Sequence, residues 1–298
     1  MNAYRICSLR EKDPSPGGPA WHCVVEHLDD RGPVEHGSLA VVCNLGLAAP
    51  RYWFYVGQVA YRADTLPLAR RDRVLLLGND YTGARALRAI QLQADAIPDA
   101  LDALLLGTLA LLPELDEDVR HPLASRTIVE LPSTAADGRS PFWEGLGARF
   151  YSPTLPPRDA VEREEAEAAV AMLLPRQPVV VSLLAPSARE AIGVIADDQG
   201  HLADALARCG FRRGLHVNAC DGGPVFEAQG GWRAADLPLA QARAEDACER
   251  WLVRLPGRDE AWVLPARRAE GGLGISPAHA ALLGVDYGTT CIASRLPG

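Results

Sequence analysis

Alternating apolar and polar positions predict that the first third of the chain is rich in strands. Short runs with a period of two residues, many aromatic or β-branched side chains, and turn residues between them are typical of antiparallel strands. Asp29-Asp30-Arg31-Gly32, between the second and third runs, predicts a hairpin turn. The predicted strands are residues 3–9, Trp21–His27, Ser38–Leu45, Tyr52–Tyr61 and Val74–Leu77.

Proline and glycine mark the breaks between these runs. Residues 13–20 hold three prolines and two glycines, a composition that excludes a helix or a central strand and predicts a loop. Gly78–Gly83 follows a buried-type strand and predicts a turn. For Asn79 and Asp80 within it, two interpretations stay open: turn chemistry, or contact with a substrate.

The middle of the chain changes to a helical period. Alternating helices and strands after a β-rich start predict an α+β fold. Gly210 follows the last of these helices, as expected for a helix C-terminus. The predicted helices are Pro98–Leu112, Glu162–Leu174, Ala185–Ile192 and Leu202–Cys209, and the predicted strands are Ile128–Leu131, Val179–Leu184 and Leu215–Ala219.

The tail predicts a small β-rich module with one capped helix. Ser276 is a good N-cap for a helix that ends at Leu283, because Gly284 follows directly. We therefore divide the chain into a core at 1–228, a linker at 229–247 and a C-terminal module at 248–298. The predicted strands of the tail are Trp251–Leu255, Ala261–Leu264 and Thr290–Ser294.

Composition narrows the function classes. The 298 residues carry a net charge of −8, which argues against nucleic acid or an anionic membrane as partner. The seven cysteines are scattered without a C-x-x-C spacing, which argues against a zinc site or a disulfide scaffold. Charged residues interrupt the N-terminus and no apolar run approaches ~20 residues, so we expect no secretory signal, no membrane span and a cytoplasmic location.

One segment is more specific than composition. Gly138–Ser152 holds four aromatic residues, three glycines and two arginines. Together with several other segments in the same order, it resembles the bacterial arginine N-succinyltransferases. Those segments are Ala49–Gly57, Leu76–Gly83, Leu173–Pro178, Gly210–Arg212, Asp221–Pro224 and Ile275–Leu283.

The resemblance implies a fold, a reaction and partners. The family has a GNAT-like acyltransferase core with a small β-rich C-terminal module. It transfers a succinyl group from succinyl-CoA to the α-amine of arginine or ornithine, so the resemblance implies a co-substrate and no permanently bound cofactor or metal. Some members are hetero-oligomers, which implies an intact succinyltransferase paralogue, or a second copy of this chain, as partner.

The loop that would bind CoA departs from the family. A diphosphate binds well at a helix N-terminus behind a basic, glycine-rich loop. Residues 93–102 contain no arginine, lysine or glycine and instead carry Asp95, Asp99 and Asp102. Carboxylates repel a diphosphate, although Pro98 still suits the first turn of a helix. The family contact with acyl-CoA maps to Ile90.

The acid–base chemistry departs as well. Breaking a thioester with an amine requires proton transfer, for which histidine is suited. By the resemblance, Ala196 occupies the position of the family's proton-donor histidine. His201 is a candidate substitute or an exposed residue at a helix start, and His216 a site residue or an ordinary strand residue. The family's carboxylate after the Gly78–Gly83 turn falls at Ala86, and its N-terminal helices have no counterpart.

Two functions therefore remain. The first is a catalytically degenerate relative that retains the fold and acts as a subunit. The second is an active acyl-CoA-dependent N-acyltransferase with a rearranged site and a different acceptor. The sequence contains no motif that would indicate a third function: G-x-S-x-G, Walker, H-E-x-x-H and dinucleotide-binding motifs are all absent.

Overall fold

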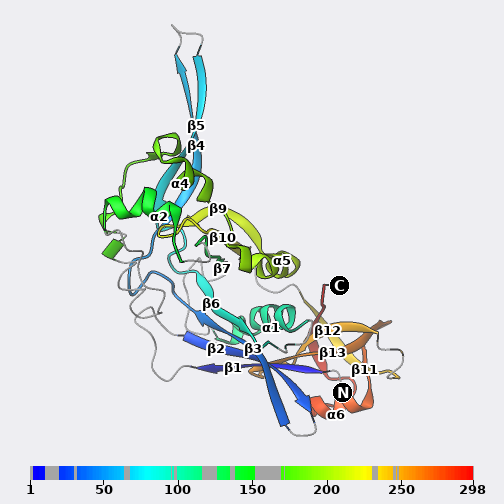
Figure 1. Ribbon diagram of the computed structural model, residues 1–298. Helices are drawn as coiled ribbons and strands as arrows, with labels where there is room; N and C mark the ends of the chain where they lie inside the picture. The colour runs from blue at the N-terminus through cyan, green and yellow to red at the C-terminus, as the bar shows by residue number, and fades with distance from the viewer. Residues whose placement is uncertain are drawn as a thin grey trace.

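Strands dominate the structure, and most of them are neighbours in one long sheet (Figure 1). The computed structural model describes residues 3–10, 20–29, 32–63, 68–94, 96, 99–115, 126–134, 138–151, 169–170, 172–229, 234–243, 246 and 248–297. The strands of the first half are β1 (Tyr4–Arg10), β2 (Ala20–Asp29), β3 (Gly32–Val42), β4 (Trp53–Ala63), β5 (Leu68–Gly78), β6 (Arg85–Leu92) and β7 (Arg126–Glu130). Those of the second half are β8 (Val179–Val180), β9 (Arg212–Asn218), β10 (Pro224–Gln229), β11 (Ala235–Gln241), β12 (Glu249–Arg254), β13 (Glu260–Ala269), β14 (Gly272–Ile275) and β15 (Thr290–Arg295).

The helices are fewer and mostly short. The α-helices are α1 (Ala100–Leu115), α2 (Pro141–Gly145), α4 (Pro186–Ala191), α5 (Gly200–Arg208) and α6 (Pro277–Leu283), and the 3-10 turns are η1 (Gly147–Arg149), η2 (Val181–Leu183) and η3 (Asp197–Gln199). The mixed α/β class agrees with the predicted α+β composition. Among the described residues, no helix has the length and apolarity needed to cross a bilayer.

The described sheet is largely antiparallel, with two parallel pairs, β6–β7 near its centre and β11–β14 among the C-terminal strands. Strands β1, β2, β3 and β6 are successive antiparallel neighbours, and β6 then runs parallel to β7. The predicted hairpin between β2 and β3 is confirmed, because their pairing runs to Asp29↔Gly32. Beyond β7 the order continues through β10, β9, β4, β5 and β8.

Helix α1 forms the main hydrophobic core. The helix is apolar on nearly every side, as expected for a buried helix, and Leu104 and Leu105 are fully buried. It packs on β1, β2, β3 and β13 and touches α5. Gly107 lies against Ile6 of β1, where an added Cβ would meet the isoleucine side chain at 2.6 Å. The close approach of α1 to the sheet therefore depends on that glycine.

The C-terminal strands close on themselves. Strand β12 pairs with both β13 and β15, β15 pairs with β11, and β14 joins β11 to β13. The five strands therefore form a ring around a separate apolar cluster, which α6 covers with Ala280 and Leu283. Ser276 caps α6 by accepting from the His279 N–H, and Gly284 ends it in the left-handed conformation, as predicted.

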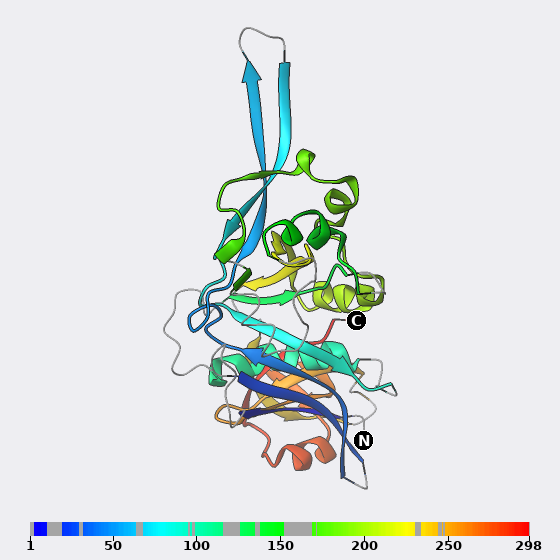
Figure 2. The same cartoon turned by 60° about the vertical axis from the view of Figure 1, so that its left-hand side comes forward.

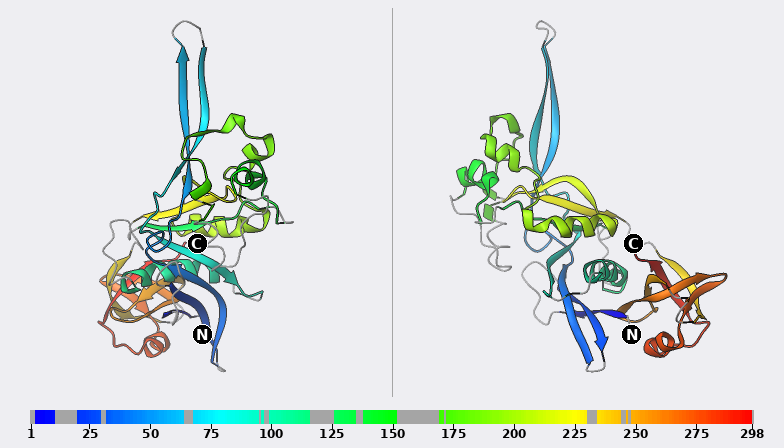
Figure 3. Two further views of the ribbon diagram at one scale, coloured as in Figure 1. Left: turned by 90° about the vertical axis from the view of Figure 1, so that its left-hand side faces the viewer. Right: turned by 45° about the vertical axis from the view of Figure 1, so that its right-hand side comes forward.

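A two-stranded ribbon projects from the other end of the molecule. Strands β4 and β5 pair without a register break from Trp53↔Gly78 to Ala63↔Leu68. The root of the ribbon is flanked by β9 at residues 53–55 and by β8 at Val74 and Leu75, and η2 also contacts β5. In the views of Figures 2 and 3 the outer part of the ribbon projects beyond the rest of the described chain. We call these two strands the arm.

Several predictions need correction. The predicted strand Val179–Leu184 is a strand only at Val179–Val180 and then turns into η2. Strands β6, β10, β11 and β14 were not predicted. β11 lies inside the stretch treated as a linker, and the division at 228 and 248 stays a prediction. Of the predicted loop at 13–20, Ala20 is the first residue of β2, and the rest lies outside the described residues, as does most of the predicted helix Glu162–Leu174.

The α1 core makes a stability prediction. Leu104→Ala deletes a fully buried side chain, and leaving a cavity in a packed core costs ~2–5 kcal/mol of unfolding free energy. Urea denaturation followed by circular dichroism would measure the loss. Leu47→Ala is the matched control, because Leu47 is 53% exposed and its truncation should change stability by less than ~0.5 kcal/mol. Equal losses at both positions would contradict the packing described here.

Candidate active site

The parallel strands β6 and β7 separate after two residue pairs. They pair at Arg85↔Thr127 and Ala86↔Ile128 only. β6 then bulges against β3, where the register shifts and Ala89 takes a positive φ of 48°. Ile90 lies directly after Ala89, beyond the residues of β6 that pair with β7, and its side chain packs against the main core.

The carboxylates at the start of α1 are held in ion pairs. Asp102 is buried and accepts two hydrogen bonds from Arg208, at 3.0 Å from Nε and 2.8 Å from Nη2. Asp99 accepts one from Arg250 at 3.1 Å. The expectation that both would face a ligand as free anions is therefore corrected: they tie α1 to α5 and to β12. Asp95 and Pro98 lie outside the described residues.

Ala196 borders a cavity of about 680 Å³ at the carboxyl end of β7. Its N–H donates to the carbonyl of Pro132 at 2.8 Å, which fixes the segment against the β7 end. The described lining contains hydroxyls, such as Ser133, and the carboxylates of Glu190, Asp197 and Asp198, but neither histidine nor cysteine. The position given to a proton donor by the resemblance thus faces a cavity whose described ionisable groups are carboxylates.

His201 lies outside that lining. It is exposed on the first turn of α5, five residues after Ala196. Asn79 contributes to a turn, because its carbonyl accepts from the Thr82 N–H at 3.0 Å. The neighbouring Asp80 points its carboxylate at His216 instead. The substrate and catalytic roles considered for these residues stay predictions.

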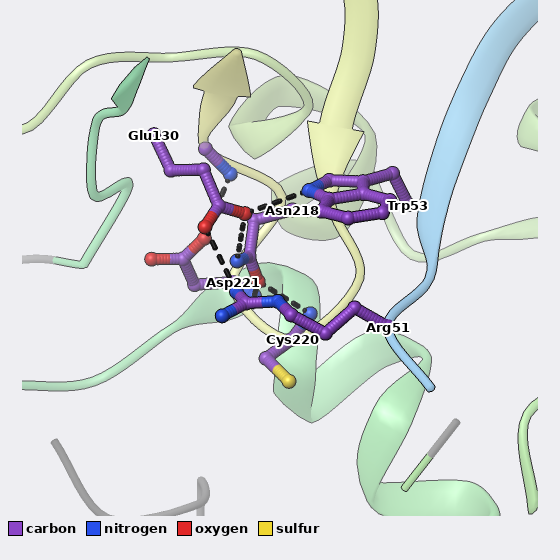
Figure 4. Close-up of polar contacts among 7 residues, drawn as sticks. Arg51, Trp53, Glu130, Asn218, Cys220 and Asp221 are labelled. Carbon is purple, nitrogen blue, oxygen red and sulfur yellow. Dashed lines mark hydrogen bonds and ion pairs between the residues drawn. The ribbon is translucent and has the colours of Figure 1, made fainter. Parts of the chain in front are cut away.

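Glu130, which sequence reasoning missed, organises the end of β7 (Figure 4). Its Oε1 accepts from Trp53 Nε1 and Asn218 Nδ2, and its Oε2 from Arg51, each at 2.8 Å. The Arg51 and Glu130 side chains are only 7% and 10% exposed. A buried carboxylate is tolerated only when such donors satisfy it. Three segments far apart in sequence therefore meet at one charge.

The network continues into the Asp221–Pro224 turn. The side-chain carbonyl of Asn218 accepts from the Cys220 and Asp221 N–H groups, and the Asp221 carboxylate accepts from the Gly223 and Ser133 N–H groups. A side chain at Gly223 would collide with the Leu131 carbonyl, so glycine is required there. This turn therefore fixes the Ser133 backbone, which forms one wall of the Ala196 cavity.

The first two aromatic residues of the segment 138–152 are buried. Ser140 caps α2 by accepting from the Trp143 N–H at 3.1 Å. Phe142 and Trp143 are buried in a cluster with Phe54 and Leu75 at the root of the arm. Core packing, rather than a wall for an acyl group, therefore accounts for both rings.

A second group of ionisable residues lies beside the middle of β7, where Glu227 of β10 pairs with Ile128. The Tyr81 hydroxyl donates to Glu227 and lies 3.0 Å from His216 Nδ1. Burial, together with the bond to Glu227, raises the pKa of Tyr81 far above its usual value, so Tyr81 stays a phenol. Since its one hydrogen goes to Glu227, the hydroxyl accepts from His216, which places a proton on Nδ1.

The other nitrogen of His216 faces a carboxylate. Nε2 is buried without a hydrogen bond among the described residues and lies 3.4 Å from Asp80 Oδ2. His216 and Glu227 line a cavity of about 1360 Å³, together with Arg126, Arg212 and residues of α1 and α5. The strand before Asp221 was the available signal for His216, but nothing local pointed to Tyr81 or Glu227. No group of three metal-binding side chains occurs in the described part of the chain.

Comparison with known proteins gives the family. A family model described as arginine N-succinyltransferase beta subunit matches residues 7–231. The chain belongs to this family. The arginine N-succinyltransferase subunit beta of Pseudomonas aeruginosa is 30% identical over 276 residues, which cover 90% of this chain and 80% of that protein. The arginine N-succinyltransferase of Yersinia pestis (strain Pestoides F) is 29% identical over 214 residues, covering 72% of this chain and 60% of the relative.

A solved structure agrees with the arginine N-succinyltransferase assignment. Arginine/ornithine succinyltransferase subunit AI from Pseudomonas aeruginosa is similar with a TM-score of 0.68 and 25% identity, over 95% of this chain and 83% of that chain. The resemblance drawn from ordered segments is confirmed. In this arginine N-succinyltransferase family member, Ala49–Gly57 and Asp221–Pro224 supply partners of the Glu130 network.

The Glu130 network makes a testable prediction. Glu130→Gln removes the charge that Arg51 needs and turns one acceptor into a donor facing other donors, so we expect a loss of ~3–5 kcal/mol in unfolding free energy. Trp53→Phe, which removes one neutral donor, should cost much less, about 1–3 kcal/mol. Chemical denaturation of both variants measures the difference. A Glu130→Gln protein as stable as the parent would show that the network is not held by charge.

Proposed function

We propose that this chain is a catalytically degenerate arginine N-succinyltransferase-like subunit of arginine catabolism. The carrying observation is the cavity beside Ala196, whose described lining offers carboxylates and hydroxyls but no histidine. Aminolysis of a thioester needs a group that exchanges protons near neutrality, and general acid–base help is worth ~10²–10⁴-fold in rate. A site without such a group should catalyse the reaction slowly.

The start of α1 supports the same proposal. A CoA diphosphate requires cationic or backbone donors. Asp99 directly precedes α1, and Asp102 lies in its first turn. Arg250 and Arg208, the arginines that contact them, are already held in these ion pairs. The proposal includes a GNAT-like core, with the backbone of β6 at Ile90, beyond its pairing with β7, as the remaining acyl-CoA contact. It also includes a cytoplasmic location and a paralogous or identical subunit as partner.

The proposal predicts weak succinyl-CoA binding. We expect a Kd above ~100 μM, or less than ~5.5 kcal/mol of binding free energy. Several charge-assisted phosphate contacts at ~1.5–3 kcal/mol each are missing. Isothermal titration calorimetry on the full chain measures this directly. A low-micromolar Kd would contradict the loss of the CoA site.

Rebuilding the chemistry should require two changes together. Ala196→His alone should leave free-thiol release from succinyl-CoA at background, because the thioester is not held in place. The same change combined with arginine, lysine and glycine in the loop 94–99 should exceed either change alone. The assay uses arginine or ornithine as acceptor. Turnover of ~1 s⁻¹ or more by the unmodified chain would overturn the degenerate proposal.

One observation favours the alternative, an active N-acyltransferase with a rearranged site. His216, hydrogen-bonded to Tyr81 and backed by Glu227, borders the cavity of about 1360 Å³. Three hydrogen-bonded or adjacent ionisable side chains of this kind can accept a proton from a substrate and donate it again.

The alternative makes its own prediction. If any acyl-CoA and amine support turnover, His216→Ala should lower kcat by ~10²–10⁴-fold, whereas His201→Ala, at an exposed position, should leave kcat unchanged. Tyr81→Phe should lower kcat less than His216→Ala, because His216 keeps its imidazole but loses the hydrogen bond to Tyr81. Loss of activity in His201→Ala with activity retained in His216→Ala would reverse the assignment.

A further inference from the structure

The arm extends well beyond the strands β8 and β9 that pair with its root. Its two strands have 11 residues each, or ~35 Å at ~3.3 Å per residue. An isolated two-stranded ribbon is at best marginally stable in water. Beyond the short pairings with β8 and β9, both of its edges are unpaired among the described residues. A ribbon of this length that stands clear of the body (Figure 2) is suited to contact another chain.

The two faces of the arm differ in charge. Arg70 pairs with Asp72 and donates to Ser182 of η2, which follows β8 along the edge of β5. Because side chains alternate along a strand, Arg71 and Arg73 lie on the other face, in line with Leu75, which packs into the body at the root of the arm. Both are exposed and form no ion pair with any described residue. Beyond its root, this face of the arm therefore carries two exposed arginines, in a chain whose net charge is −8.

An acidic surface lies near the root of the arm. Glu190 of α4 and Asp197 and Asp198 of η3 are exposed and line the Ala196 cavity, and none has an ion pair among the described residues. The segment η2, which contacts β5, leads directly into α4, and Figure 1 shows α4 beside the root of the arm. We call Glu190, Asp197 and Asp198 the acidic rim.

We propose that the arm of one chain docks on the acidic rim of a second copy, and that the two copies exchange arms reciprocally. Two arms lying antiparallel place each tip about one arm length from its own root. Each tip then reaches the root of the other chain, where the acidic rim lies. Every pairing occurs twice, as expected for a twofold-symmetric interface. The proposal deepens the proposed function, on whose identical-subunit partner it rests, and holds whether or not the chain is active.

A charge-reversal exchange tests the pairing. Arg71→Glu with Arg73→Glu reverses the charge of the arm. Asp197→Arg with Asp198→Arg reverses the charge of the acidic rim. Each variant alone should be monomeric, because both contacts in its homodimer are repulsive. An equimolar mixture should restore a dimer, because each reversed surface then meets its complement. Sedimentation velocity of the full chains at low salt, one of them carrying a fluorescent label, measures the species formed.

The control reverses Arg267 and Arg268, two exposed arginines of the C-terminal ring, by changing both to Glu. It makes the same charge change at the other end of the molecule and should dimerise like the parent. Far-ultraviolet circular dichroism checks folding, and Arg71→Gln with Arg73→Gln replaces any arm variant that fails to fold. We expect the parent dimer to weaken at least ~10-fold between low and high salt.

Three outcomes would overturn the proposal. The parent could remain monomeric at ~100 μM, a concentration above the Kd of most specific dimers. It could dimerise without any effect of the arm variants, which would place the interface elsewhere. The reversed chains could fail to pair in the mixture, which would separate the arm from the rim. Dimerisation only with a different subunit belongs to the first outcome, because the parent alone is then monomeric.

Discussion

One buried carboxylate determines how the central strands meet. Glu130 needs its donors, because an unpaired charge at that depth costs several kcal/mol. Those donors come from the segment entering β4 and from the end of β9. Asn218 in turn accepts a hydrogen bond from the Asp221 N–H, and the Asp221 carboxylate accepts one from the Ser133 N–H, so both segments are fixed relative to Glu130. The wall of the Ala196 cavity is therefore positioned by a residue that does not line it.

The parts of the fold that could be predicted are those encoded locally. The β2–β3 hairpin, the buried α1 and the capped α6 each follow from a period or a cap within a few residues of sequence. Strand β6 (Arg-Ala-Leu-Arg-Ala-Ile-Gln-Leu) has a helix-forming composition, and pairing with β3 and β7 overrides that propensity. β14 is four residues long with two glycines, too short and too weakly patterned to recognise.

The candidate site was harder to predict, because its partners are distant in sequence. Glu130 and Arg51 are separated by 79 positions, and Asp102 and Arg208 by 106. Local composition could show that the loop before α1 is acidic, but it could not show that its carboxylates are paired. Tyr81, His216 and Glu227 likewise meet only through the folded sheet. Family resemblance supplied Ala196 and Ile90 because it carries such long-range information.

The first strand of the chain, β1, pairs with a strand near its C-terminus, β13. β1 lies between β2 and β13, and Tyr4 stands opposite both His27 and Val263. During synthesis β1 can join β2 early, but its other edge stays open until the ring of β11 to β15 has emerged. Pairings of such long range form late and slowly. A ribosome-bound chain that lacks its last fifty residues therefore exposes an unpaired sheet edge, and that edge is an aggregation hazard.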